Sequence, residues 1–88
     1  MAYNVLIVDD SAVMRTMLRR VLAMAGIDVG EVHEAPNGQV GLECLERSWI
    51  DLALIDINMP VMNGEELIQR IRANPSTHDL AVIVVSSK

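Results

Sequence analysis

Acidic residues stand where two apolar segments of the chain end. Asp9 and Asp10 directly follow the run "NVLIV", and Asp56 ends the run "LALID". A further apolar run, "AVIVV", is followed by the hydroxyl side chains of Ser86 and Ser87. A carboxylate can act as a nucleophile or bind a cation, and a hydroxyl can hydrogen-bond a group that is being transferred. If this chain carries chemistry, these are the residue types that would perform it.

The elements that must position these residues follow from the spacing of apolar side chains. Continuous apolar runs predict buried strands, and apolar residues three and four apart predict helices. Strands are expected at "YNVLIVDD" (3–10), "GEVHEA" (30–35), "DLALID" (51–56) and "LAVIVVSS" (80–87), and helices at 11–26, 39–49 and 65–73. Ser11 is a good N-cap for the first helix, Gly26 should end it, and Asn74-Pro75 should end the third. Strict alternation of strands and helices predicts an α/β fold with a parallel sheet and right-handed crossovers.

A sheet order of 2-1-3-4 would bring the acids together. Strands one and three would then be neighbours, and ligands of such sheets bind at the carboxyl ends of the strands near this point. Two like charges a few ångströms apart repel by roughly 3 to 4 kcal/mol at an effective dielectric constant near 20. Such a cluster must therefore raise a pKa or bind a cation. Oxygen ligands without a nearby His or Cys favour Mg²⁺, which could align a phosphoryl group with one carboxylate as nucleophile.

A purely structural interpretation of the same residues is also open. A single aspartate at a strand end is more often a turn or cap residue than a nucleophile. Two adjacent aspartates before a helix can simply favour the positive end of its dipole. Three acids and a hydroxyl at one edge of one sheet favour the functional interpretation.

Composition excludes several classes of protein. A chain of 88 residues has room for one domain, and its net charge of -5 with no Phe argues against a nucleic-acid surface. The basic residues Arg15, Arg19 and Arg20 are expected to form the solvated face of a helix. The apolar runs are too short to span a bilayer, and no secretory signal is expected from the first residues. The single cysteine, Cys44, fits a reducing, cytoplasmic location.

Other residues that attract attention have simpler explanations. His33, His78 and Cys44 lack the spacing of a transition-metal site, and Cys44 is expected to face the core from the second helix. Met14, Met17 and Met24 are expected to fill the core beneath the first helix. Trp49 is expected to be a packing anchor.

Four segments together resemble the receiver domain of bacterial two-component response regulators, and chemotaxis response regulators in particular. They are "LIVDDSAVMR", "EAPNGQVGLECL", "LALIDINMPVMNGEELIQRIR" and "AVIVVSS", in that order along the chain. The resemblance covers the whole chain and implies a flavodoxin-like fold. It also implies a phosphoacceptor signalling domain rather than an enzyme, acting with a histidine kinase as phosphodonor.

The resemblance implies a role for each matching residue. Asp56 corresponds to the phosphoacceptor and Ser86 to the hydroxyl that contacts the phosphoryl group. Asp10 corresponds to the direct Mg²⁺ ligand and Asp9 to an acid that holds Mg²⁺ mainly through water. Asn58 corresponds to the position whose main-chain carbonyl completes the ligand set. Pro60 and Gly64 are expected only to shape the loop.

The sequence also departs from the family pattern. Receiver domains continue with a fourth helix, a fifth strand that ends in an invariant lysine, and a fifth helix, whereas this sequence ends at Lys88. We therefore expect an incomplete flavodoxin-like fold, Mg²⁺ binding that is retained, and phosphorylation that is impaired. The exposed fourth strand and the uncovered faces are expected to promote self-association, for example as a dimer.

Two other functions compete with the phosphoacceptor switch. The first is a structural, self-associating module whose acidic site is vestigial. The second is a phosphatase with an aspartate nucleophile. That class is discounted because it needs a second acid two residues after the nucleophile, where this chain has Asn58.

Overall fold

The seven expected elements are all present in the computed structural model, which describes residues 2–85. Along the chain they are β1 (Tyr3–Val8), α1 (Ala12–Met24), β2 (Val29–Ala35), α2 (Gly38–Arg47), β3 (Leu52–Asp56), α3 (Gly64–Ala73) and β4 (Ala81–Val85). The boundaries differ from the expected ones by a few residues at most, except that the expected end of the fourth strand, at residue 87, lies outside the described residues. None of the helices in this part of the chain has the length and apolarity needed to cross a membrane.

The four strands form one parallel sheet in the order β2-β1-β3-β4. This confirms the predicted flavodoxin-like order. Val8 in β1 is paired with Ala35 of β2 on one side and with Ile55 of β3 on the other. The carboxyl ends of these three strands therefore finish almost level, and residues that follow β1 and β3 must be neighbours.

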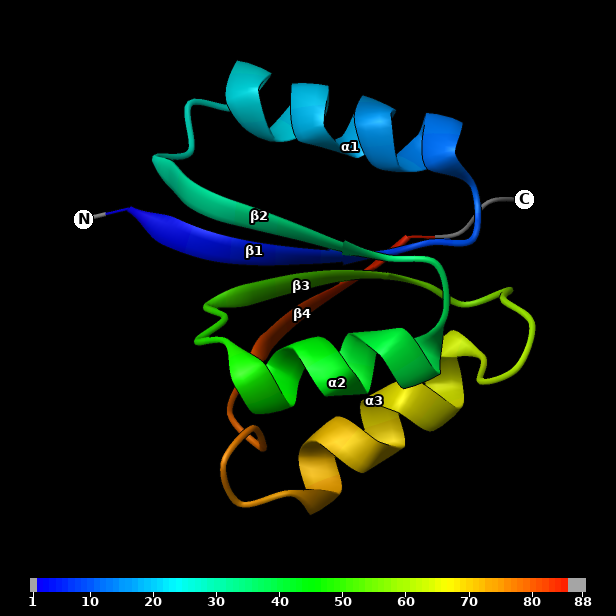
Figure 1. Cartoon of the computed structure of the whole chain (residues 1–88). Helices are drawn as coiled ribbons and strands as arrows, with labels where there is room; N and C mark the ends of the chain where they lie inside the picture. The colour runs from blue at the N-terminus through cyan, green and yellow to red at the C-terminus, as the bar shows by residue number, and fades with distance from the viewer. Residues whose placement is uncertain (1, 86–88) are drawn as a thin grey trace.

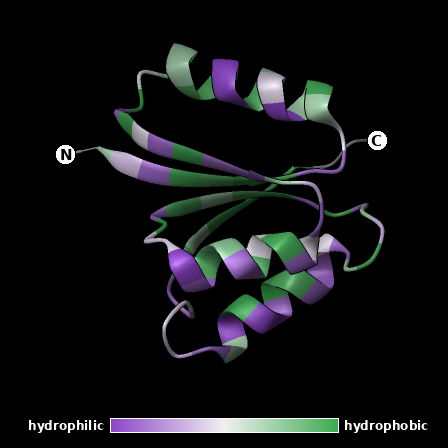
Figure 2. Ribbon diagram, in the orientation of Figure 1, coloured by the Kyte–Doolittle hydropathy of each residue, from purple (hydrophilic) through white to green (hydrophobic). Residues whose placement is uncertain are grey.

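The helices cover the two faces of the sheet unequally. Figure 1 shows α1 alone on one face and α2 and α3 side by side on the other. The larger core cluster lies on the α2/α3 side and includes Leu6, Val8, Ala35, Cys44, Ile50, Ala53, Ile55, Met59, Met62, Leu67, Ile71 and Leu80. The smaller cluster lies on the α1 side and consists of Val5, Ile7, Leu22 and Leu54. Figure 2 shows β3, β4 and the carboxyl-terminal part of β1 as largely hydrophobic ribbons between the two layers, whereas β2 alternates between hydrophilic and hydrophobic residues.

Each helix begins at a polar cap. The side chains of Ser11, Asn37 and Asn63 each accept a hydrogen bond from the backbone N–H three residues further on. This confirms the prediction for Ser11 and satisfies a donor that the helix itself leaves unpaired. Gly26, just after α1, has a φ of 76°, a left-handed conformation that costs glycine little.

The methionines of α1 do not fill the core as expected. Met17 and Met24 are 54% and 85% exposed, so the prediction was wrong for both, and only Leu22 of this helix is fully buried. Successive helical residues turn by about 100°, so Met17 points well away from Leu18, which packs on the sheet. The apolar residues of α1 extend around more of its circumference than the sheet can cover.

Trp49 is not a packing anchor either. It lies beyond the end of α2 and is 75% exposed, with its indole Nε1 donating to Asp51 Oδ1 at 2.9 Å. Cys44 is buried on α2, as expected. His33 lies in β2 and His78 in the loop before β4, also as expected.

Candidate functional site

Three carboxylates gather at the carboxyl edge of the sheet. Asp9 and Asp10 are the first two residues of the loop between β1 and α1, and Asp56 is the last residue of β3. Each contributes a carboxylate oxygen, and these oxygens all lie within 4.8 Å of one another. The level ends of β1 and β3 produce this cluster, as the sheet order predicted.

Backbone N–H groups orient two of the carboxylates. Ser11 N donates to Asp9 Oδ1 at 2.9 Å, and Asn58 N donates to Asp56 Oδ1 at 3.2 Å. The other oxygen of each group, Oδ2, is buried and has no hydrogen-bond partner among residues 2–85. A buried oxygen without a partner is costly, so both oxygens would gain from a ligand.

The electrostatics of the cluster also favour a positive ligand. Asp9 and Asp56 are each only 1% exposed, whereas Asp10 is exposed. Burial raises the pKa of Asp9 above its usual value, and the carboxylates of Asp56 and Asp10 raise it further. The hydrogen bond from Ser11 N opposes these effects and lowers the pKa, but the net direction remains upward.

The residues of the cluster fit a hard divalent cation. All the donor atoms are oxygens, and the cluster contains no His or Cys. The carboxylates of Asp9 and Asp56 each also contain a buried Oδ2 atom that has no hydrogen-bond partner among residues 2–85. Such a donor set matches the preference of Mg²⁺ and Ca²⁺ rather than that of transition metals.

The loop after β3 packs closely against Asp56. Met59 and Met62 are buried within the larger core cluster, and Gly64 N donates to Ile57 O at 3.0 Å. A Cβ atom added at Gly64 would lie 2.3 Å from the carbonyl oxygen of Asp56. Glycine at this position therefore lets the first turn of α3 approach the end of β3. This agrees with the expectation that Gly64 shapes the loop.

The expected roles of two site residues, Asn58 and Ser86, stay predictions. Asn58 lies two residues after Asp56 with an exposed side chain, and the metal-binding role of its main-chain carbonyl stays a prediction. Ser86, the expected phosphoryl contact, lies outside the described residues, as do Ser87 and Lys88.

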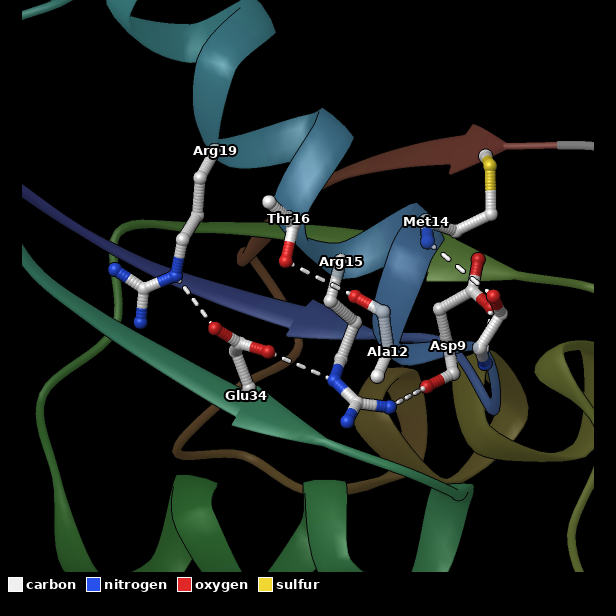
Figure 3. A network of polar contacts seen from close by, with 8 residues as sticks. Asp9, Ala12, Met14, Arg15, Thr16, Arg19 and Glu34 are labelled. Carbon is white, nitrogen blue, oxygen red and sulfur yellow. Dashed lines mark hydrogen bonds and ion pairs between the residues drawn. The ribbon is translucent and has the colours of Figure 1, made fainter.

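A polar network that was not predicted from the sequence lies next to the acids (Figure 3). Arg15 Nη1 donates to the main-chain oxygen of Asp9 at 2.6 Å, and Arg15 Nε donates to Glu34 Oε1 at 2.8 Å. Arg19 binds the other oxygen of Glu34. The interpretation of these arginines as a solvated face was wrong for Arg15, whose side chain is only 17% exposed. A usable signal was present: two arginines four residues apart on one helix, and an acid just before the end of the next strand.

Comparison with known proteins identifies the fold and the family. The family model described as the response regulator receiver domain matches residues 5–88. The crystal structure of the N-terminal domain of a response regulator receiver protein from Methanoculleus marisnigri JR1 superposes with a TM-score of 0.86 at 33% identity. That superposition covers 100% of this chain and 69% of the other. A receiver protein from Pseudomonas putida gives a TM-score of 0.84 at 33% identity, covering 98% and 69%.

Curated relatives are similar at comparable levels. The chain is 37% identical over 84 residues to the nitrate/nitrite response regulator protein NarL of Escherichia coli K12, covering 96% of this chain and 38% of NarL. It is 34% identical over 86 residues to the chemotaxis protein CheY homolog of Campylobacter jejuni, covering 97% and 65%. The chain therefore spans less than two thirds of the length of either relative.

Proposed function

Because the chain belongs to the family of response regulator receiver domains, we propose that Asp56 accepts a phosphoryl group from the phosphohistidine of a histidine kinase. A receiver domain is a phosphoacceptor signalling module rather than an enzyme. The observation that carries the proposal is the carboxylate cluster. One oxygen of Asp56 accepts from the Asn58 N–H, and the other has no partner in the described part of the chain.

The transfer requires little movement of the acceptor. The Asp56 carboxylate attacks the phosphorus atom, a P–O bond forms as the P–N bond to the histidine breaks, and the imidazole leaves. The Asn58 N–H holds one carboxylate oxygen, so the side chain stays oriented during the attack. Ser86 would supply a hydroxyl to a phosphoryl oxygen.

The same acids would hold Mg²⁺ during the reaction. Asp9, Asp10 and Asp56 would supply carboxylate oxygens, and Asn58 would supply its main-chain carbonyl. When bound, the ion neutralises charge on the incoming phosphoryl group. We place this phosphoryl transfer in the cytoplasm, where receiver domains typically act. We also infer that residues 1–88 fold as one domain around the four-stranded sheet.

Intact-mass measurement with acetyl phosphate tests the acceptor directly. In Mg²⁺ we expect one phosphoryl adduct on the wild-type chain, on a minor fraction of the protein because phosphorylation is expected to be impaired. The control variant Asp79→Asn, whose carboxylate is exposed and remote in sequence from the cluster, should give the same adduct to the same extent. Asp56→Asn should form none, and EDTA should abolish the adduct. An adduct that persists in Asp56→Asn would contradict the assignment. The extent of labelling also measures whether these 88 residues suffice for acceptor chemistry.

The structure of β4 favours a second candidate function, self-association with another copy of the chain. Within residues 2–85, β4 pairs with β3 on one side only, and Ile83 and Val84 are 52% and 47% exposed. Exposed apolar edge strands promote pairing with another chain. We expect light scattering at micromolar concentration to show a dimer or larger species that Ile83→Lys converts to monomer. A wild-type monomer would exclude this candidate without affecting the first.

A further inference from the structure

Residues of β2 fix both backbone groups of Asp9, its N–H and its carbonyl, although β2 carries none of the three acids. On one side, Asp9 N donates directly to Ala35 O at 3.0 Å. On the other, the carbonyl oxygen of Asp9 accepts from Arg15 Nη1 at 2.6 Å. Glu34, the neighbour of Ala35, in turn accepts from Arg15 Nε at 2.8 Å. The last two residues of β2 thus fix both backbone groups of Asp9, one directly and one through Arg15.

The carbonyl held by Arg15 belongs to the peptide unit that joins Asp9 to Asp10. A peptide unit is planar, so its orientation fixes where the Cα atom of Asp10 lies. Asp10 is the exposed member of the cluster and enters it from the loop rather than from a strand. Its placement therefore depends on the orientation of this one peptide unit.

We propose that Arg15, oriented by Glu34, is a positioning residue that sets the Asp10 carboxylate for cation binding. The inference rests on the proposed function, because it assigns Arg15 a role toward the same metal site. Arginine suits this role because its planar fork can donate to two acceptors at once, which a lysine ammonium cannot do with the same rigidity. The hydrogen bonds from Arg19 and Arg15 lower the pKa of Glu34, so its carboxylate is charged at neutral pH.

Charge alone predicts the opposite effect. A positive side chain near the site repels a cation, so its removal should strengthen Mg²⁺ binding slightly. If Arg15 positions Asp10, its removal should instead weaken binding. A substitution of Arg19 distinguishes the charge effect from the positioning effect, because Arg19 lies on the same helix as Arg15 and contacts the same Glu34. No hydrogen bond joins Arg19 to Asp9 among the contacts of the described residues.

Titration calorimetry with Mg²⁺ on the metal-free chain provides the first test. We expect Arg15→Met to weaken Mg²⁺ binding by about tenfold, as for other residues that orient metal ligands. Arg19→Met should leave the affinity unchanged or slightly stronger. Arg15→Lys, which keeps the charge but loses the fork, should fall between the wild type and Arg15→Met. Arg15→Met that binds Mg²⁺ as tightly as Arg19→Met would overturn the inference.

Hydrogen exchange without metal provides a second, independent test. The Ser11 amide donates to Asp9 Oδ1, so its exchange reports the placement of this loop. We expect Arg15→Met, or Arg15→Lys if the first variant folds poorly, to speed exchange of Ser11 relative to amides in β3. Arg19→Met should not. Unchanged exchange in both Arg15 variants would overturn the inference even if Mg²⁺ binds. Absence of Mg²⁺ binding by the wild type would instead overturn the proposed metal site.

Discussion

Two of the three residues of the acidic edge (Asp9, Asp10 and Asp56) are buried as completely as the core beneath α2 and α3, although the two regions are built from opposite kinds of side chain. Leu67 in the core is 0% exposed, and Asp56 at the edge is 1% exposed. In the core, apolar groups pack against one another and burial stabilises the fold. At the edge, the carboxylates of Asp9 and Asp56 are buried, each with one oxygen that has no partner within residues 2–85, and burial opposes the fold.

The core therefore stabilises the fold, whereas the acidic edge destabilises it. The core follows the apolar pattern of its sequence, whereas the acidic edge violates the usual rule that buried charges are paired. A bound cation, alone or together with a phosphoryl group, would reduce the cost of burying the carboxylates at the acidic edge. It would not change the packing of the core. Substitutions in the two regions should therefore change the free energy of unfolding in opposite directions.

The largest effect should come from truncating the core. Leu67→Ala removes a fully buried side chain from α3 and should lower the free energy of unfolding by about 3 kcal/mol. Met24→Ala removes a side chain of similar size from the exposed side of α1 and should change it by less than about 0.5 kcal/mol. Urea denaturation measures both. Equal losses would mean that α1 is covered in solution.

The next effect tests the point where the two regions meet. Gly64→Ala places a methyl group against the carbonyl oxygen of Asp56 and should lower the free energy of unfolding by about 2 kcal/mol through overpacking. Gly26→Ala adds the same group in open space at positive φ, so it should cost only about 1 kcal/mol of backbone strain. Thermal unfolding by circular dichroism compares them. A smaller loss for Gly64→Ala than for Gly26→Ala would show that β3 and α3 separate easily.

A change at the edge should act in the stabilising direction. In EDTA, Asp9→Asn removes one of the clustered charges and should raise the free energy of unfolding by about 2 kcal/mol, since such charges repel strongly at short range. Asp79→Asn, at an exposed site, should have an effect under about 0.5 kcal/mol. Saturating Mg²⁺ should reduce or reverse the difference in free energy of unfolding between Asp9→Asn and the wild type. The reason is that Mg²⁺ stabilises only a folded chain that binds it. Destabilisation by Asp9→Asn in EDTA would contradict the proposed contrast.

The smallest effect concerns pH and the ion pairs beside the edge. Hydrogen bonds from Arg19 and Arg15 lower the pKa of Glu34 below its ordinary value of 4.5 in the folded chain. Its contribution is therefore complete above that ordinary value and is lost as the pH falls through the lower, folded-state pKa. The free-energy gap between wild type and Glu34→Gln should be about 1 kcal/mol at neutral pH. This difference in free energy should disappear at low pH. A difference that does not depend on pH would show that the ion pairs contribute nothing.

Much of the site follows from the sequence because topology alone brings it together. Parallel strands in the order β2-β1-β3-β4 end at one edge, so any acids that follow β1 and β3 must meet there. No side-chain detail was needed for Asp9, Asp10 and Asp56. Residue type and position along the helix, rather than topology, placed Cys44 in the core and Ser11 at the cap of α1.

The rest could not be read from spacing because it depends on how one helix is rotated over the sheet. The apolar residues of α1 extend over too broad an arc to show which of them face inward, so Met17 and Met24 were misplaced. The contact of Arg15 with the Asp9 carbonyl depends on that rotation and on one side-chain conformation. Trp49 was misplaced because hydrophobicity gives no sign that its indole Nε1 bonds Asp51 at the surface.

The position of Trp49 has a spectroscopic consequence. It is the one tryptophan of the chain, is 75% exposed, and lies at the amino ends of the strands, opposite the acids. Its emission should therefore already resemble that of a solvated indole and change little when the chain unfolds or when a cation binds near Asp56. It also lines a hollow of about 370 Å³ together with His78 and Leu80. Intrinsic fluorescence of this protein thus reports on that hollow, and an optical signal from the acidic edge needs a fluorophore introduced there.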